Sequence, residues 1–385
     1  MRPATLERDG SHRSEVGPVE LFFDLVYVFA IIQLSHLLIG NLSPAGAAQT
    51  VVIFAAVWWG WNYTAWAMNW LNPRSPAVQL LNAVLMLTAL GMSVTIPDAF
   101  GRGAWLFVGC YLAMGILRPV FMMVAFRGRQ LASNYRMLLG WTLLAGVFWV
   151  AGAAFPEKWR LIFWLVAVLV DYSAPLLHYR LPGIGAAPMH LWDTDAEHLA
   201  ERNRLVFIIA LGESILLMGG VLVDEGGVSL ALAVSLVVGF ASLFVLWWNY
   251  FAAAGPAAVG GRETTGALRS AYAYAHALMV LGAILVAVST ELRLSHDHLD
   301  TSIVMVTIGG PVVYLVGNLL FLLSRFGRLP VSRVIAIAVL AVMAVVTLLY
   351  VEDVPIVVLS LCVFAVTGSL AGHTVLNSRK SGPSV

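Results

Sequence analysis

The sequence has few charged residues, and this scarcity excludes most classes of soluble protein. Only 11% of its 385 residues are Asp, Glu, Lys or Arg, whereas 60% are hydrophobic. A typical soluble domain carries about 25% charged residues, which cover its surface. The deficit predicts a protein whose partner is the lipid bilayer. A formal net charge of +1 offers no basic surface, so we expect no nucleic-acid partner.

Common catalytic and metal-binding motifs are also missing. The two cysteines, Cys110 and Cys362, lie within apolar runs and indicate neither a disulfide framework nor a zinc site. There is no phosphate-binding GxxxxGK[ST] loop, HExxH pair or DDxxD cluster, and Gly212-Glu213-Ser214 does not fit a nucleophile elbow. We therefore expect no metal, no cofactor and no nucleotide-driven pump in this chain.

Twelve apolar stretches are long enough to cross a bilayer. A hydrocarbon core about 30 Å thick requires roughly 20 residues per helix. The expected spans are 19–39, 47–70, 76–97, 103–125, 133–154, 158–178, 202–222, 228–252, 267–290, 299–323, 331–350 and 354–375. Residues 1–17 lack the basic start and cleavage site of a signal peptide, so the first span should remain in the mature protein. The sequence predicts an all-α polytopic membrane protein.

The distribution of basic residues predicts the orientation of these spans. Of the 22 Lys and Arg residues, 17 lie on the face that carries both termini, four lie on the opposite face, and Arg118 lies within a span. Cytoplasmic loops carry an excess of Lys and Arg. We therefore expect both termini to be cytoplasmic.

The two halves of the chain resemble each other. Trp59-Gly-Trp-Asn62-Tyr63 ends the second span and Trp247-Trp-Asn249-Tyr250 ends the eighth. This match favours duplication of a six-helix unit over chance similarity between apolar helices. The expected organisation is a cytoplasmic segment (1–18), a first six-helix repeat (19–180), a linker (181–200), a second repeat (201–376) and a cytoplasmic tail (377–385). Six is an even number, so the repeats would be parallel, and transporters tend to bind substrates between repeats.

Charged side chains within the spans need a partner or a function, because each costs about 2.5–3.5 kcal/mol at mid-bilayer. Glu20, Asp24 and Tyr27 fall on one face of the first helix. Glu213 lies inside the seventh helix, and Asp171 inside the sixth. Arg118 is the only basic residue deep within a span rather than near its end, so we expect it to neutralise Asp24 or Asp171.

Two interpretations of these groups stay open. In the first, Asp24, Glu213, Glu20, Tyr27 and Asp171 form an ion or substrate pathway, with Glu20 and Tyr27 at its cytoplasmic mouth. In the second, the polar residues only fix helix packing through hydrogen bonds. The residues expected to support such a network are His36, Asn62, Arg118, His178, His198, Glu201, Arg202, Ser214, Asn249 and His276.

Two segments resemble the bacterial low temperature requirement protein A family. They are residues 19–36, VELFFDLVYVFAIIQLSH, and residues 198–215, HLAERNRLVFIIALGESI. Asn203-Arg204 departs slightly from the usual pattern. The resemblance implies a multi-span protein of the bacterial inner membrane, named for a growth phenotype. A looser likeness to lysosomal-type potassium channels, through Phe23-Asp24 in the first helix, indicates a pore or pathway.

These observations favour a transport or permeation protein, in which helices 1 and 7 line a pathway for a small ion or small molecule. The first alternative is an intramembrane enzyme that acts on a lipid or isoprenoid, such as a cyclase. Asp24, Glu213 or Asp171 would donate the proton, and Trp59, Trp61 and Tyr63 would stabilise cationic intermediates. The second alternative is a non-catalytic membrane scaffold or stress protein. Formation of a homo-oligomer stays open.

Overall fold

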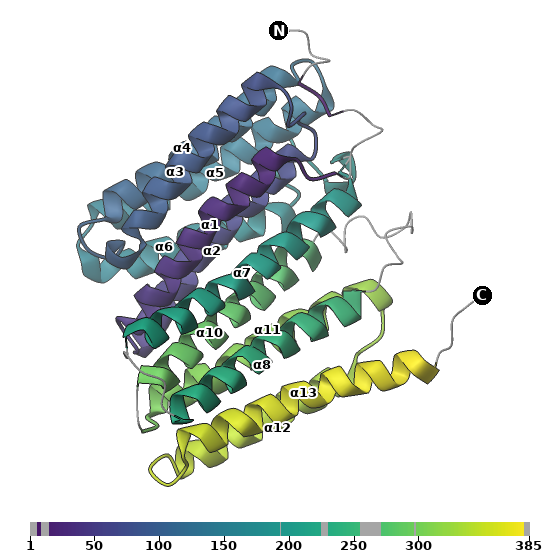
Figure 1. Ribbon diagram of the computed structural model, residues 1–385. Helices are drawn as coiled ribbons and strands as arrows, with labels where there is room; N and C mark the ends of the chain where they lie inside the picture. Colours follow the sequence, from purple (N-terminus) through teal and green to yellow (C-terminus); the bar gives the residue numbers. More distant parts are fainter. Residues whose placement is uncertain are drawn as a thin grey trace. The chain divides into compact units, whose positions relative to one another are not determined.

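The computed structural model describes residues 6–8, 15–192, 194–224, 230–254, 271–295 and 298–380. Within these residues the regular structure is helical, and two isolated β-bridges form no sheet. The prediction of an all-α protein is confirmed. The long helices, shown in Figure 1, are α1 (Pro18–Ile39), α2 (Pro44–Met68), α3 (Pro76–Thr95), α4 (Ala104–Ala125), α5 (Gln130–Ala154), α6 (Glu157–Leu176), α7 (Ala196–Asp224), α8 (Leu230–Ala254), α10 (His276–Ser295), α11 (Thr301–Phe326), α12 (Val331–Leu349) and α13 (Ile356–Lys380).

Three short helices join or extend the long ones: η3 (Ile96–Asp98), η4 (Met189–Leu191) and the π-helix η5 (Ala271–Ala275). Proline explains several helix starts, because it stands at the first position of α1, α2 and α3, where its missing N–H costs nothing. The predicted starts of spans 228–252 and 267–290, and residues 381–385 of the predicted tail, lie outside the described residues.

Eleven of the described helical segments are long and apolar enough to cross a membrane. The remaining predicted span corresponds to α2, whose Trp, Asn, Tyr and Thr residues lower its mean hydropathy. Nineteen of its 25 residues are buried. The helix is nevertheless about 37 Å long at 1.5 Å per residue. α2 therefore has the length of a span, but its side chains face protein rather than lipid.

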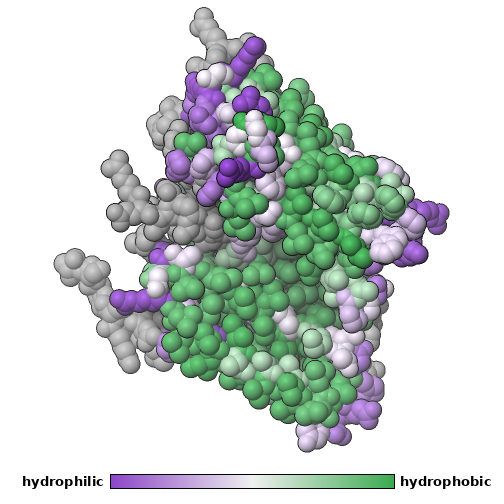
Figure 2. Space-filling view, turned by 180° about the vertical axis from the view of Figure 1, so that it is seen from behind, coloured by the Kyte–Doolittle hydropathy of each residue, from purple (hydrophilic) through white to green (hydrophobic). Residues whose placement is uncertain are grey.

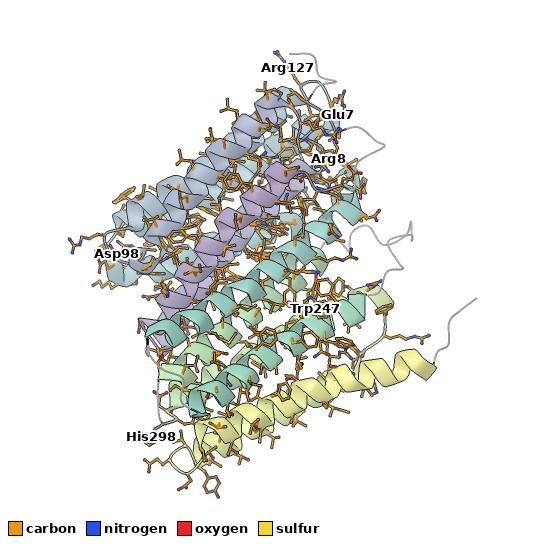
Figure 3. The ribbon with its side chains drawn as sticks, in the orientation of Figure 1. Glu7, Arg8, Asp98, Arg127, Trp247 and His298 are labelled. Atoms are coloured by element: carbon orange, nitrogen blue, oxygen red, sulfur yellow. The ribbon has the colours of Figure 1, made fainter. Side chains whose placement is uncertain are left out.

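The chain divides into two compact units, residues 1–205 and 206–385. In unit 1, α1 packs on α3, and α3, α4, α5 and α6 pack in sequence, while α2 contacts α1, α4 and α6. Successive helices run in opposite directions, so the loops alternate between the two ends. Figure 3 shows Glu7, Arg8 and Arg127 at one end of this unit and Asp98 at the other.

In unit 2, α10 and α11 form the closest pair of helices. A Cβ atom added to Gly282 would lie 2.5 Å from the backbone N of Tyr314, and one added to Gly310 would lie 2.9 Å from the backbone N of Val286. Small residues allow this close approach, as is common between membrane helices. α11 also packs on α12, and α13 packs on both α8 and α12.

The boundary between the units falls within α7, whose first turns belong to unit 1. It lies a few residues beyond the predicted start of the second repeat. In each unit the second helix packs on the last, α2 on α6 and α8 on α13. Duplication of a six-helix unit stays a prediction.

The surface is that of a membrane protein. Large apolar side chains are widely exposed, among them Leu87 at 69% and Leu349 at 73%. On the face seen in Figure 2, hydrophobic residues cover most of the surface and hydrophilic residues gather along its edges. Soluble monomers rarely expose apolar patches of this extent. The protein is a multi-pass membrane protein.

Candidate functional site

The start of α1 places two carboxylates inside unit 1. Glu20 is the third residue of the helix, and its Oε2 accepts a hydrogen bond from the backbone N–H of Gly17 at 2.8 Å. This contact caps the first turn of the helix. Asp24 follows one turn later on the same face. Both side chains are fully buried, so neither Glu20 nor Tyr27, which is 2% exposed, forms an open mouth.

The first turns of α7 present two basic side chains to these carboxylates. Asp195 Oδ1 accepts the backbone N–H groups of Glu197 and His198 and so caps the start of the helix. His198 and Arg202 are four residues apart and therefore lie on one face. Both are fully buried.

Asp24 and Arg202 form a bidentate ion pair. Arg202 Nε donates to Asp24 Oδ2 at 3.0 Å, and its Nη2 donates to Oδ1 at 2.5 Å. Trp61 Nε1 of α2 donates to Oδ1 at 2.7 Å. Two parallel N–H···O bonds between guanidinium and carboxylate combine charge attraction with a fixed geometry. The pair therefore ties α1 to α7.

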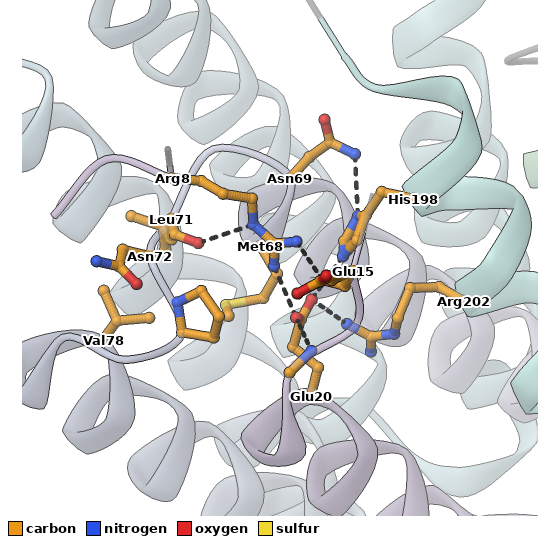
Figure 4. A network of polar contacts seen from close by, with 12 residues as sticks. Arg8, Glu15, Glu20, Met68, Asn69, Leu71, Asn72, Val78, His198 and Arg202 are labelled. Atoms are coloured by element: carbon orange, nitrogen blue, oxygen red, sulfur yellow. Dashed lines mark hydrogen bonds and ion pairs between the residues drawn. The ribbon is translucent and has the colours of Figure 1, made fainter. Parts of the chain in front are cut away.

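Glu20 lies at the centre of a larger network, shown in Figure 4. Its Oε1 accepts from His198 Nε2 at 2.8 Å and from Arg202 Nη1 at 3.1 Å. Its Oε2 accepts from Arg8 Nη2 at 2.7 Å. Arg8 also donates through Nε to Leu71 O at 3.3 Å and through Nη1 to Glu15 O at 2.7 Å. The segment before α1 thus reaches into the interior of unit 1.

Asn69, at the end of α2, fixes the tautomer of His198. Its Oδ1 accepts the backbone N–H of Asp195 at 2.6 Å, and its Nδ2 donates to Asp195 O at 3.1 Å. These two contacts set the orientation of the amide, so Nδ2 also donates to His198 Nδ1, which lies 3.1 Å away. A ring nitrogen that accepts carries no proton. His198 is therefore a neutral imidazole that donates its Nε2–H to Glu20.

We call Arg8, Glu20, Asp24, His198 and Arg202 the charge cluster. It contains two carboxylates, two guanidinium groups and one neutral imidazole, so its net charge is zero. All four carboxylate oxygens accept at least one hydrogen bond from within unit 1. The carboxylates are already neutralised by guanidinium groups, and a cation or proton would have to compete with Arg202 for them.

The prediction that Arg118 neutralises Asp24 or Asp171 is wrong. Arg118 Nη1 donates to Gly60 O at 3.0 Å and to Thr64 Oγ1 at 2.8 Å, and its guanidinium lies 5.3 Å from the centre of the Tyr63 ring. Among the described residues, no carboxylate lies within ion-pair distance of it. Arg118 therefore binds uncharged acceptors on α2, and Arg202 is the partner of Asp24.

Asp171 forms a separate polar site in unit 1. Its Oδ2 accepts from Tyr111 Oη at 2.8 Å and from Trp149 Nε1 at 3.3 Å. Tyr111 and Trp149 belong to an aromatic cluster with Phe107 and Trp164, whose neighbouring rings lie 5.0–6.0 Å apart. No basic side chain within the described part of the chain forms an ion pair with Asp171.

The other predicted residues lie outside the charge cluster. His36 and His178 are exposed, and Glu201 pairs with Arg204 at 3.2 Å on a partly exposed surface. Tyr27 donates to Met114 Sδ at 3.4 Å, and Asn62 is buried in α2. In unit 2, Glu213 and Ser214 are buried, Asn249 Nδ2 donates to Thr367 O at 3.2 Å, and His276 Nε2 lies 3.0 Å from Tyr250 Oη.

The sequence did not indicate three residues at the charge cluster, its member Arg8 and the hydrogen-bond partners Trp61 and Asn69. Arg8 lies in a polar segment with no periodicity, and Trp61 appears among the predicted residues only in the enzyme alternative, as a stabiliser of cations. Asn69 ends α2 and carries no motif. The described residues include no group of three or more His, Cys, Asp or Glu side chains arranged to hold a metal ion.

Comparison with known proteins relates the chain to one family. Residues 15–368 match the family model described as bacterial low temperature requirement A protein (LtrA). The chain is also 34% identical over 346 residues to Uncharacterized protein RA0937 of Rhizobium meliloti (strain 1021). That alignment covers 87% of this chain and 84% of the Rhizobium protein. The matched residues include Glu20, Asp24, His198 and Arg202, but Arg8 precedes the family match.

Proposed function

The chain belongs to the bacterial low temperature requirement A (LtrA) family, and from this premise we propose that it is a transport protein of the inner membrane. In this proposal the charge cluster is an ionic lock between α1 and the first turns of α7, on the cytoplasmic side. The transported species is a small cation or a proton. The observation that carries the proposal is the burial of two carboxylates and two guanidinium groups that neutralise one another.

Stability alone gives little reason to bury these charges. Removing an ion from water costs several kcal/mol, and well-packed apolar residues often replace a buried ion pair without loss of stability. Ionisable groups inside membrane segments commonly mark ion or proton pathways. A paired carboxylate can also change its partner. If a proton or cation displaced Arg202 from Asp24, the bond between α1 and α7 would be broken.

The test is ion flux through purified protein in liposomes. Vesicles loaded with K⁺ and a pH-sensitive dye are diluted into K⁺-free buffer. Addition of a proton ionophore then reports K⁺ efflux, and a separate series with valinomycin and no proton ionophore reports proton movement through the protein. We expect flux above that of empty liposomes.

The informative variant is Asp24→Leu/Arg202→Met, which replaces the ion pair with apolar side chains of similar size. Its interface can pack but cannot respond to a cation or proton, so its flux should fall to the level of empty liposomes. Arg118→Met, which removes a buried arginine outside the charge cluster, is the matched control. Wild-type flux in the folded double variant would refute the lock and favour a structural role for the charge cluster.

A second candidate function rests on Asp171. A carboxyl group without a basic partner, held by Tyr111 and Trp149 beside two further aromatic rings, has the composition of a general acid near walls that stabilise cations. This arrangement favours the enzyme alternative, with a lipid or isoprenoid substrate. Lipid extracts of cells expressing wild-type protein or Asp171→Asn distinguish the functions, because an enzyme changes the lipid profile and a transporter does not.

A further inference from the structure

A pocket of about 550 Å³ opens beside the charge cluster in unit 1. Its lining comes from the segment before α1, the start of α1 and the turn between α2 and α3. Arg8, Arg74, Asn72 and Gln79 contribute guanidinium and amide groups, and Glu15 contributes the one carboxylate. The volume is in the range typical of pockets for small ligands.

The lining favours an anionic group. Arg8 is 5% exposed and is oriented by its bonds to Leu71 O, Glu15 O and Glu20. Arg74 is exposed, and no carboxylate of the described residues lies within ion-pair distance of it. Guanidinium groups match the geometry of phosphate oxygens, with which they form charge-assisted hydrogen bonds.

The surface next to the pocket indicates that the anion carries acyl chains. Phe22 lies one turn along α1 from the pocket residue Val19 and is 57% exposed. Leu87 lies two turns along α3 from the pocket residue Gln79 and is 69% exposed. α1 and α3 pack against each other. The pocket, which holds the guanidinium of Arg74 and that of Arg8, already paired with Glu20, therefore stands at the ends of α1 and α3. These two adjacent helices both expose apolar side chains.

We infer that this pocket binds the phosphate of a membrane phospholipid, whose acyl chains lie along the exposed face of α1 and α3. Basic pockets between membrane helices on the cytoplasmic side commonly bind lipid head groups. Arg8 lines the pocket and also pairs with Glu20, so the bound head group lies against one member of the charge cluster. The site does not depend on ion transport.

Native mass spectrometry of the detergent-solubilised protein, titrated with phosphatidylglycerol, tests the inference. Wild-type protein should retain one phosphatidylglycerol with saturable affinity. Arg74→Gln should weaken this binding about fivefold, the equivalent of roughly 1 kcal/mol for one basic side chain at the membrane surface. Arg127→Gln is the matched control, since Arg127 is an exposed arginine at the same end of unit 1, and it should bind as the wild type does.

Two further probes distinguish the source of the phosphate. Diacylglycerol has the acyl chains without the phosphate, and inorganic phosphate has no acyl chains; neither should compete with phosphatidylglycerol. Competition by inorganic phosphate at millimolar concentration would overturn the assignment to a lipid. Equal affinity of Arg74→Gln and Arg127→Gln, or equal binding of diacylglycerol, would overturn recognition of the phosphate in this pocket.

Discussion

The ion pair between Asp24 and Arg202 makes a quantitative prediction for the variant Arg202→Met. Methionine fills much of the volume of arginine but removes two bonds to Asp24 and one to Glu20. The charge cluster would then hold two buried carboxylates and only one guanidinium group, that of Arg8. Removing one partner of a buried ion pair typically costs about 3–5 kcal/mol, because the other charge stays buried and unpaired. We expect a loss of this size in the free energy of unfolding.

The double variant Asp24→Leu/Arg202→Met should be more stable than the single variant, although it carries one more substitution. Arg8 and Glu20 still balance each other in it, and the main remaining cost is the lost acceptor of Trp61 Nε1, about 1–3 kcal/mol. The bond from Arg202 to Glu20 is also lost, but Glu20 Oε1 keeps its bond from His198. We therefore expect the double variant to recover roughly 2 kcal/mol of the loss. Such a recovery would show that Arg202→Met is unstable because Asp24 keeps an unpaired charge, since poor packing would not improve when a second residue is replaced.

The measurement is unfolding by dodecyl sulfate in mixed micelles at neutral pH, followed by circular dichroism. Arg118→Met is the matched control. Arg118 donates to Gly60 O and Thr64 Oγ1, and these two groups also bond to each other at 2.9 Å, so each keeps a partner when Arg118 is removed. The control should lose no more than about 1–2 kcal/mol. A loss below about 1 kcal/mol for Arg202→Met, the size typical of an exposed ion pair, would refute the buried ion pair.

Three further predictions concern single contacts. His198→Phe removes the partner of both Glu20 and Asn69, so it should lower the free energy of unfolding by about 1–3 kcal/mol in the same titration. No change would contradict these two hydrogen bonds. Gly310→Ala should lower the free energy of unfolding by about 1–3 kcal/mol, because its Cβ would press on the backbone of α10. Gly309→Ala is the control and should be neutral, because nothing lies within 4 Å of its added Cβ. Equal unfolding midpoints for the two variants would count against the close contact between α10 and α11. Trp61→Phe removes one hydrogen bond to Asp24 and should lower the free energy of unfolding by about 0.5–1.5 kcal/mol. If the lost bond is the cause, the same substitution should have almost no effect in protein that already carries Asp24→Leu.

The sequence was sufficient to predict the helices, but it could not predict which charged groups meet. Runs of about 20 apolar residues specify spans because the bilayer leaves backbone N–H and C=O groups no partner outside a helix. Helical periodicity placed Glu20 and Asp24 on a common face. It does not specify which faces of two helices pack together, because that depends on the packing of all their neighbours.

The error over Arg118 shows this limit. Arg118 is the only basic residue deep within a predicted span, whereas Arg202 is the first residue of one. In the structure α7 begins at Ala196, so Arg202 lies almost two turns inside the helix and reaches Asp24. Arg8 was beyond prediction for another reason, since a polar segment outside the spans carries no periodicity that would indicate a buried side chain.

The enclosure of α2 by other helices constrains how the chain is inserted during synthesis. Residues 44–68 leave the ribosome before α4 and α6 exist, yet these two helices and α1 provide the protein surface that shelters them. Nascent α2 therefore has only α1 of its three neighbours beside it until α4 and α6 have been synthesised.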